Sequence, residues 1–554
     1  MENKRRKRRL WPWLIVLAVL IGLGVCNYWP AGPTKIIPSR ETTYITGPLN
    51  PDGTPNYVKY LDDKYSADIT PENNAAPLLL RALGPELLPG SWWDDYSGTI
   101  DLYPQAKETL RRLGLTEDVF KGDKHFIRWE DRVVPALADA NGASPAATNG
   151  DEDEDDGPDF EDVYWDLHRE GKVHPELAAW LAANAEPLEF IRQASKKERL
   201  YLPLISDSTP PQAIGARQVN LDSLREAVMA LRVFAMLRMT RGDAAGAWRD
   251  VITIHRLARL FGQSPALLLH MLATSAEGRT AYTGMRFAVH HLEQTAPLAR
   301  DILRDLGALG SETDVATRLE AERLMGLDAI MHFYRGFPVA GSGAGSPAKT
   351  FQVDADWNQM LREMNGWYDR AFAPVLMPAH EGREQAAEAF HDEIKALSDG
   401  AVASDDLPGR VMLLAYGGRL TRAERTRVVL QTLVALVIPN LSYRANRRDS
   451  DKTWCDLERV AVALAAYHAE KGRWPAKLTE LRPSLLKEIP LDRFSGKPLI
   501  YKPREDGYLL YSVGMNMRDD GGPHDDDKPA DDKSDDIGAQ VPPANQGAQS
   551  QPAN

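Results

Sequence analysis

The stretch "LDSLREAVMALRVFAMLRMTRGDAAGAWRDVITIHRLARLFG" at residues 221–262 decides the fold. Apolar residues recur along 221–240 at the i, i+3, i+4 and i+7 spacing of an amphipathic helix. Arg241-Gly242-Asp243 breaks this pattern and favours a turn rather than an adhesion motif. The pattern resumes over 244–262, where several alanines permit close packing. The stretch therefore predicts two antiparallel helices that pack as a hairpin.

Helical periodicity continues on both sides of this hairpin, and strand signals are nearly absent from 160 to 450. The apolar run at 428–438 is too short to cross a bilayer, so it is predicted to be a core helix. No clean 34-residue repeat is present, which favours an irregular antiparallel helical domain over a repeat array. Further helices are predicted near 265–292, 296–308, 312–336, 354–373, 381–398 and 416–437.

The N-terminus has the pattern of a membrane anchor. Six Lys and Arg residues at 4–9 precede a stretch of about 20 mainly apolar residues at 10–29, flanked by Trp and Tyr. The basic side predicts a cytoplasmic N-terminus and an extracytoplasmic bulk, on the bacterial cytoplasmic (inner) membrane. Two alternatives stay open, a cleaved signal peptide and lipidation of Cys26.

The charge of the chain is unevenly distributed. The net charge is −13, but residues 151–162 and 519–554 carry most of it, and 1–9 are basic. The rest is close to neutral and has no basic stripe, which argues against a nucleic-acid partner. The two acidic runs are predicted to be solvated spacers. The two cysteines, Cys26 and Cys455, form no disulfide framework.

The pattern changes near 452. Residues 453–475 form one amphipathic helix that Gly472 and Pro475 would end. After the stretch "PLDRFSGKPLIY" at 490–501, residues 497–503 and 508–514 read as a β-hairpin with a turn at 504–507. Asp492 is predicted to accept backbone N–H groups within the turn that precedes the hairpin.

Three stretches carry a family resemblance: "ALAAYHAEKGRWP", "IPLDRFSGKPLIY" and "YLLYSVGMNMRDDGG". In this order they resemble the C-terminal half of the major pseudopilin of type II secretion, over about 453–522. The resemblance implies a small α+β module and a calcium ion in the loop after the hairpin, here with Asp519 and Asp520. The alternative is that these two residues begin the acidic tail. The chain lacks the Gly-Phe-x-x-x-Glu polymerisation site of that family, so assembly into a pseudopilus is not implied.

No catalytic or cofactor-binding residue is predicted, since H-E-x-x-H, G-x-S-x-G, P-loop and dinucleotide motifs are absent from the sequence. His255, His270, His290 and His291 are interpreted as packed or surface residues. Other residue patterns have ordinary interpretations as well: a helical ion pair for Asp328 and His332, an incomplete di-iron motif for Glu384, Glu388 and His391, and edge packing rather than sugar stacking for Trp92-Trp93 with Asp94-Asp95.

The sequence thus predicts a mainly α protein: an N-terminal transmembrane helix, an irregular antiparallel α-helical domain and a small C-terminal α+β pseudopilin-like module. The predicted segments are a basic tail (1–9), the transmembrane helix (10–29), a partly helical segment (30–140), an acidic linker (141–162), the helical domain (163–450), the module (451–522) and a disordered acidic tail (523–554).

The layout as a whole resembles that of bacterial membrane-anchored envelope proteins without an assigned activity. We expect a membrane-anchored extracytoplasmic scaffold or interaction protein that contacts the lipid bilayer through 10–29 and a protein partner of the envelope. The alternative is an extracytoplasmic hydrolase whose site forms between helices.

Overall fold

The computed structural model describes the chain in segments. No helix within them has both the length and the apolar character to cross a bilayer. The predicted anchor at 10–29 and the acidic linker at 141–162 lie outside the described residues. The described residues are 34–88, 92–94, 99–102, 104–122, 124–129, 175–206, 208–213, 220–265, 267–310, 315–338, 350–351, 353–400, 421–438, 442–523 and 535–541.

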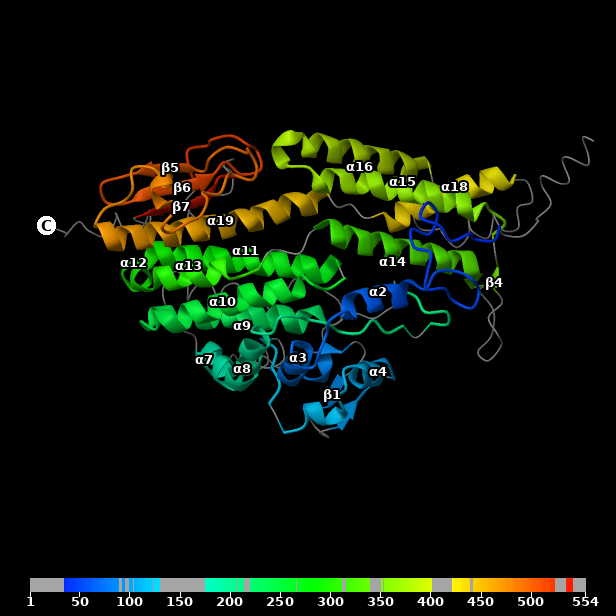
Figure 1. Cartoon of the computed structure of the whole chain (residues 1–554), viewed down its shortest axis with the longest axis horizontal. Helices are drawn as coiled ribbons and strands as arrows, with labels where there is room; N and C mark the ends of the chain where they lie inside the picture. Colours follow the sequence, from blue (N-terminus) through cyan, green and yellow to red (C-terminus); the bar gives the residue numbers. More distant parts are fainter. Residues whose placement is uncertain are drawn as a thin grey trace, which may run out of the picture.

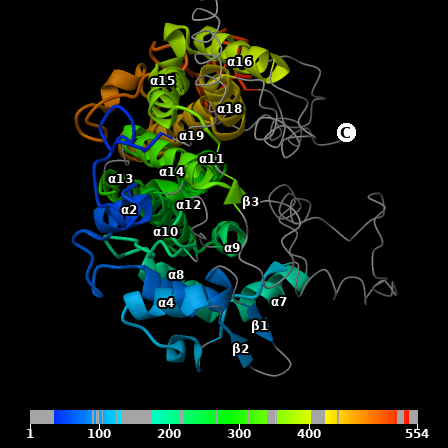
Figure 2. The ribbon, with the colours of Figure 1, turned by 90° about the vertical axis from the view of Figure 1, so that its right-hand side faces the viewer.

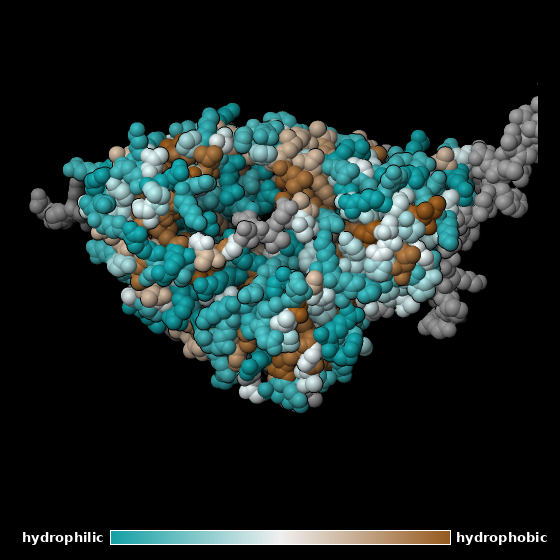
Figure 3. Space-filling model, viewed as in Figure 1, coloured by the Kyte–Doolittle hydropathy of each residue, from teal (hydrophilic) through white to brown (hydrophobic). Residues whose placement is uncertain are grey.

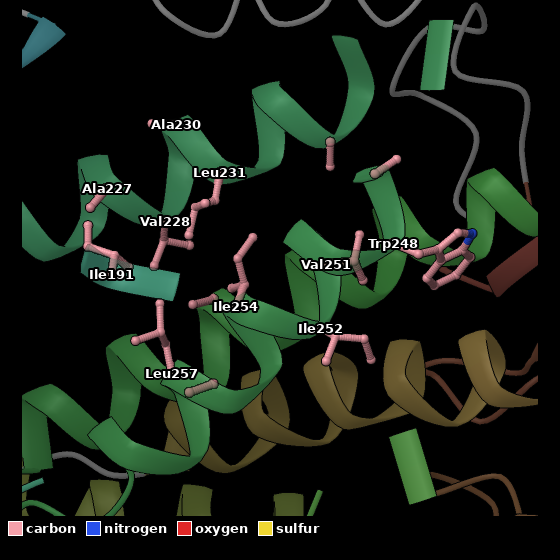
Figure 4. Close-up of a cluster of buried hydrophobic side chains, with 14 of the residues drawn as sticks. Ile191, Ala227, Val228, Ala230, Leu231, Trp248, Val251, Ile252, Ile254 and Leu257 are labelled. Carbon is pink, nitrogen blue, oxygen red and sulfur yellow. The ribbon is translucent and has the colours of Figure 1, made fainter. Parts of the chain in front are cut away.

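The hairpin at 221–262 is confirmed. Helix α9 (Leu221–Thr240) ends at the predicted turn, where Gly242 has a φ of 81°, and α10 (Ala244–Phe261) returns beside it. The Asp243 side chain accepts the Gly246 N–H at 2.9 Å and so caps α10. Figure 4 shows the side chains between the two helices, among them Val228 on α9 and Ile254 on α10.

Four long helices lie in successive order across the molecule. Helix α11 (Leu267–His290) packs on α10, and α19 (Ser442–Lys471) packs on α11 (Figure 1). Helices α11 and α19 run in the same direction, because Tyr282 contacts Trp454 and Gly284 lies against Glu458 further along both helices. The side chains of α19 that face this layer, such as Leu457, Val460 and Leu464, are buried.

A second group of helices follows the α9–α11 layer in the chain and packs around its own core. The buried side chains of α14, α15 and α18 form this core together with those of residues 36–61. The described residues therefore form two hydrophobic clusters, and Figure 2 shows α15 and α18 of the second cluster above α9 and α10 of the first. The predicted helices are confirmed here, with the bounds α14 (Val315–Arg335), α15 (Trp357–Leu376), α16 (Arg383–Gly400) and α18 (Arg422–Val437).

Short elements at the N-terminal side complete the helical part. Helix α3 packs on α8, and both belong to the same hydrophobic cluster as α9 to α11. These elements are α2 (Tyr57–Ser66), α3 (Ala76–Leu83), η1 (Pro85–Leu87), β1 (Trp92–Asp94), β2 (Thr99–Asp101), α4 (Pro104–Arg112), η2 (Glu117–Phe120), α7 (Pro175–Ala183) and α8 (Ala185–Ala194). The connecting elements further along are α12 (Leu292–Thr295), η3 (Ala296–Leu298), α13 (Ala299–Gly307), β3 (Phe337–Pro338), β4 (Thr350–Phe351), η4 (Ala379–Glu381) and η6 (Leu478–Leu481).

The C-terminal sheet contains one strand more than the sequence predicts. The hairpin of β5 (Ile500–Pro503) and β6 (Tyr508–Ser512) is confirmed. Strand β7 (Ile537–Val541) pairs antiparallel with the other edge of β6, in the order β5-β6-β7. The prediction of a disordered tail is wrong for these five residues, because they cover the otherwise open edge of β6.

The structure also divides the chain differently from the predicted boundary at 451. Helix α19 begins at Ser442 rather than near 453, and its apolar face belongs to the same hydrophobic cluster as α9 to α11. Its polar N-terminal part is held by a buried ion pair of 2.6 Å between Arg383 and Asp449. The C-terminal module and part of the helical domain therefore share one core.

The surface is predominantly hydrophilic on the face shown in Figure 3, where hydrophobic residues lie in separate small patches. Such scattered apolar residues are ordinary for a folded protein. Large apolar side chains in the described part of the chain that are clearly exposed include Leu376, Leu491, Met515 and Met517.

Candidate functional site

Asp492 organises the turn that leads into the C-terminal sheet. Its side chain is 1% exposed, and Oδ1 accepts the N–H groups of Phe494 at 2.8 Å and Ser495 at 3.0 Å. Its second oxygen, Oδ2, accepts the N–H of Val513 at 2.8 Å, directly after β6. The turn is thereby joined to the strand that precedes the acidic loop at 514–522.

The acidic loop meets the residues that precede β7. Asp520, Asp535 and Asp536 each bring a carboxylate oxygen within 4.8 Å of the other two. Gly514, with a φ of 65°, allows this approach, because a side chain there would collide with the backbone of Asp535. These three residues are called the carboxylate triad below.

Backbone hydrogen bonds hold the triad in place. Asp536 Oδ2 accepts the N–H groups of Gly522 at 2.8 Å and Asp520 at 3.2 Å, and Asp535 Oδ2 accepts the N–H of Asn516 at 2.8 Å. Burial, together with the negative charges of Asp520 and Asp519, raises the pKa of Asp536. Three neighbouring carboxylates repel one another, and a bound cation relieves that repulsion.

Asp519, the other predicted calcium ligand, forms hydrogen bonds with β6 and within the loop. Its Oδ1 accepts the Tyr511 hydroxyl at 2.6 Å and the Gly521 N–H at 3.0 Å. The bond from Tyr511 lowers the pKa of Asp519. The structure thus places Asp520, but not Asp519, in the triad. Sequence reasoning missed Asp535 and Asp536, although the alternating residues 537–541 directly after them are a weak strand signal.

The donor set of the triad consists of oxygen atoms. Carboxylate and carbonyl oxygens suit hard cations, and calcium takes six to eight of them at 2.3–2.6 Å in a flexible arrangement. The irregular loop geometry fits such a flexible shell better than the strict octahedron of magnesium. The chemistry of these residues therefore fits calcium.

A second cluster of charges lies inside the helical layer. His255 of α10 is 1% exposed and lies between Glu277 of α11 and Glu458 of α19. Its Nε2 is 3.1 Å from Glu458 Oε2, and its Nδ1 is 3.6 Å from Glu277 Oε1. Arg259 also contacts Glu277, at 2.7 Å. The sequence was interpreted to give a packed or surface residue at His255, and the structure shows it to be packed. No local sequence pattern indicates its two partners.

The protonation of His255 follows from its neighbours. Burial lowers its pKa, but Glu458 and Glu277 outweigh this effect and raise the pKa to about 9. Only the imidazolium carries a proton on both ring nitrogens and so suits two carboxylates at once. Because His255 and Glu458 are almost completely buried, a dissolved substrate cannot reach this cluster. It binds the helices together rather than forming a catalytic site.

The remaining sequence candidates do not converge. His290 lies at the C-terminal end of α11, with His291 directly after it, and Glu384, Glu388 and His391 are exposed on α16. Asp328 accepts the Ala213 N–H and His332 bonds to Gln212 at 2.7 Å, so both contact one segment rather than each other. Trp92, Trp93 and Asp94 form β1, and Cys455 is half-buried on α19.

A small cleft lies where the two hydrophobic clusters meet. Its volume of about 60 Å³ is lined by residues of α2, α4 and 200–205, and that volume accommodates a few waters. The Asp62 carboxylate accepts the Tyr201 hydroxyl at 2.6 Å and the Leu204 N–H at 3.0 Å, and it pairs with Arg112 at 2.7 Å. The Asp62 carboxylate of this cleft is therefore already hydrogen-bonded and ion-paired within the chain.

Comparison with known proteins identifies no relative. No protein-family model matches the chain, and neither a curated protein nor a solved structure matches it significantly.

Proposed function

We propose that this chain is a membrane-anchored extracytoplasmic interaction protein with a pseudopilin-like, calcium-binding C-terminal module. The observation that carries the proposal is the order of elements after Ser442. A long helix ends at Gly472, a turn around Asp492 follows, and a hairpin leads into an acidic loop. This order supports the resemblance to the C-terminal half of the major pseudopilins. The basic and apolar residues at 4–29 support the anchor.

The helical part acts in this proposal as a scaffold that presents the module. Helix α19 has its buried face in the helical core, and the C-terminal sheet follows it in the chain after the segment 472–499. The charged groups at the centre of the helical layer, His255 and Glu458, are engaged with each other. This arrangement favours a contact function over the alternative of a hydrolase.

Contact with a partner can be tested by site-specific photo-crosslinking in intact cells. We expect a crosslinker at Leu491, which is 56% exposed beside the Asp492 turn, to give one discrete adduct with another envelope protein. The matched control is a crosslinker at Glu388, an exposed position on α16. The result expected of the control is no adduct with that protein.

Three outcomes would count against the proposal: equal adducts at both positions, no adduct at Leu491, or fractionation of the full chain away from membranes. Turnover of esters, peptides or glycosides by the purified full chain would support the hydrolase instead.

A further inference from the structure

Two glycines of α11 make room for two acidic side chains of α19. Gly278 lies under Asp451, where an added Cβ would be 2.5 Å from Asp451 Oδ1. Gly284 lies under Glu458 in the same way, with the Trp248 ring beside it. The two parallel helices therefore approach each other closely at the positions where α19 carries buried carboxylates. This close approach has a cost, because glycine destabilises a helix by about 0.5–1 kcal/mol relative to alanine.

The charges at this crossing come from three helices. His255 and Arg259 belong to α10, Glu277 and Arg279 to α11, and Arg447, Asp451, Glu458 and Arg459 to α19. Asp451 is 5% exposed and has Arg447 at 3.7 Å. Buried ion pairs seldom stabilise a fold more than apolar side chains of the same size. The buried charged groups instead make the contact of α19 with α10 and α11 depend on their protonation.

We infer that this cluster is a pH-responsive latch, which holds α19 and the attached sheet β5–β7 against α10 and α11 and releases them as the pH rises. The inference does not depend on the proposed function. It stands on the burial of His255, Glu458 and Asp451, and on the glycines that receive the two acids. Strand β7 packs on both α11 and α19. A shift of α19 relative to α11 therefore also disturbs the contact of the sheet with α11.

The direction of the response follows from the folded-state pKa values. Burial raises the pKa of Asp451 to about 7, against the opposing effects of Arg447 and Arg279. The pKa of His255 is raised to about 9. For both groups the docked state binds the proton more tightly than the open state. The stabilisation from Asp451 is therefore lost as pH rises through about 7, and that from His255 is lost as pH rises through about 9.

At high pH the latch contains unbalanced charge. Loss of the proton from His255 leaves Glu458 and Glu277 without the cation between them. Burial already raises the pKa of Glu458, which shows how poorly its charge is solvated. Opening of the α11–α19 crossing admits water to these carboxylates and relieves the penalty.

Hydrogen exchange measured by mass spectrometry on the full chain tests the latch at pH 6, 7, 8 and 9. Protection factors, corrected for the intrinsic exchange rate at each pH, are compared between peptides of α19 and peptides of α14, which belongs to the other hydrophobic cluster and serves as the internal reference. We expect protection of α19 to fall about tenfold per pH unit relative to α14, because one proton is released per group.

Three variants separate charge from packing. Asp451→Asn removes the titrating acid and is expected to abolish the fall between pH 6 and 7. His255→Gln leaves the glutamates uncompensated and is expected to lower protection about a hundredfold at pH 7. The double variant His255→Gln with Glu458→Gln forms a neutral pair, which is expected to restore protection and remove the fall between pH 8 and 9. His391→Gln on exposed α16 is the matched control.

A wild-type protection factor of α19 that does not change with pH would overturn the inference, as would a double variant that keeps the wild-type pH dependence. If His255→Gln fails to fold, the double variant and Asp451→Asn still decide, since both are neutral replacements of similar shape.

Discussion

At the scale of single residues, Asp492 shows how much one side chain can organise. The sequence predicted that it would accept backbone N–H groups inside its turn, and Phe494 and Ser495 confirm this. The third bond, from Val513, crosses to the end of β6 and could not be derived from local sequence. Asp492 therefore joins two segments of the module, and its loss should affect both.

We predict that Asp492→Ala lowers the free energy of unfolding by about 3 kcal/mol, because three backbone N–H groups lose their carboxyl acceptor. Urea unfolding followed by circular dichroism measures the effect. The matched control is Asp506→Ala in the exposed hairpin turn, for which we expect a change within about 0.5 kcal/mol. Equal stability of the two variants would show that the Asp492 bonds contribute little.

His255 illustrates the opposite case at this scale. Its position on an apolar face of α10 is visible in the sequence, but Glu277 and Glu458 come from helices that start 23 and 198 residues after α10 begins. Which acid faces an imidazole depends on how three helices cross. The charge of His255 is therefore a property of the tertiary structure rather than of its neighbours in the chain.

At the scale of elements, helix α19 and strand β7 differ most from the sequence-based expectation. The polar residues 442–452 contain neither Gly nor Pro, so the helix continues through them, and the Arg383–Asp449 ion pair satisfies part of this polar segment. Strand β7 is short and follows an acidic run, and it forms because β6 offers an unpaired edge. Pairing of β7 also brings Asp535 and Asp536 to the loop at 514–522.

The loop built by β7 leads to a prediction about calcium. We expect 1 mM calcium chloride to raise the melting temperature of the full chain by about 4 °C, because binding to the folded state alone stabilises it. Asp536→Asn should remove most of this rise, since it takes a charge from the carboxylate triad. Differential scanning calorimetry provides the measurement.

Asp506→Asn, which changes an acid outside the triad, is the control and should keep the full response to calcium. An unchanged melting temperature of the wild-type chain would reject the calcium site. An equal rise with magnesium chloride would point to general charge screening instead.

At the scale of the whole molecule, two hydrophobic clusters replace the predicted succession of domains. One unites α3, α8 to α11, α19 and the C-terminal sheet, and the other unites residues 36–61 with α14, α15 and α18. Segments far apart in the chain thus lie in one core (Figure 1). The molecule cannot be divided at residue 450 without opening the first cluster.

A chain that ends at residue 450 should therefore fail to fold compactly. It loses Leu457, Val460 and Leu464, which are 0% exposed and together contribute about 6 kcal/mol, a large part of the stability of a typical domain. Size-exclusion chromatography and dye binding to exposed apolar surface provide the readout. A chain that ends at residue 541 is the control and should behave like the full chain. A compact, cooperatively unfolding 450-residue product would show that the two parts are independent.

The sequence by itself determined the positions of the helices α9 and α10, of most other long helices and of the β5–β6 hairpin. Periodicity, caps such as Asp243 and turns such as Gly242 act within a few residues, so they can be recognised without knowledge of the rest of the chain. The same local chemistry made the role of Asp492 in its turn predictable. The predictions of a membrane anchor and of a protein partner stay predictions.

Only the tertiary structure decided that α19 completes the helical core, that β7 covers the edge of β6, and that the triad consists of Asp520, Asp535 and Asp536. The same holds for the convergence of His255, Glu277 and Glu458. The physical reason is common to all four. Each contact joins segments that lie apart in the chain and meet through the packing of apolar faces or the pairing of strand edges. Neither an apolar face nor a strand edge specifies its partner in the sequence.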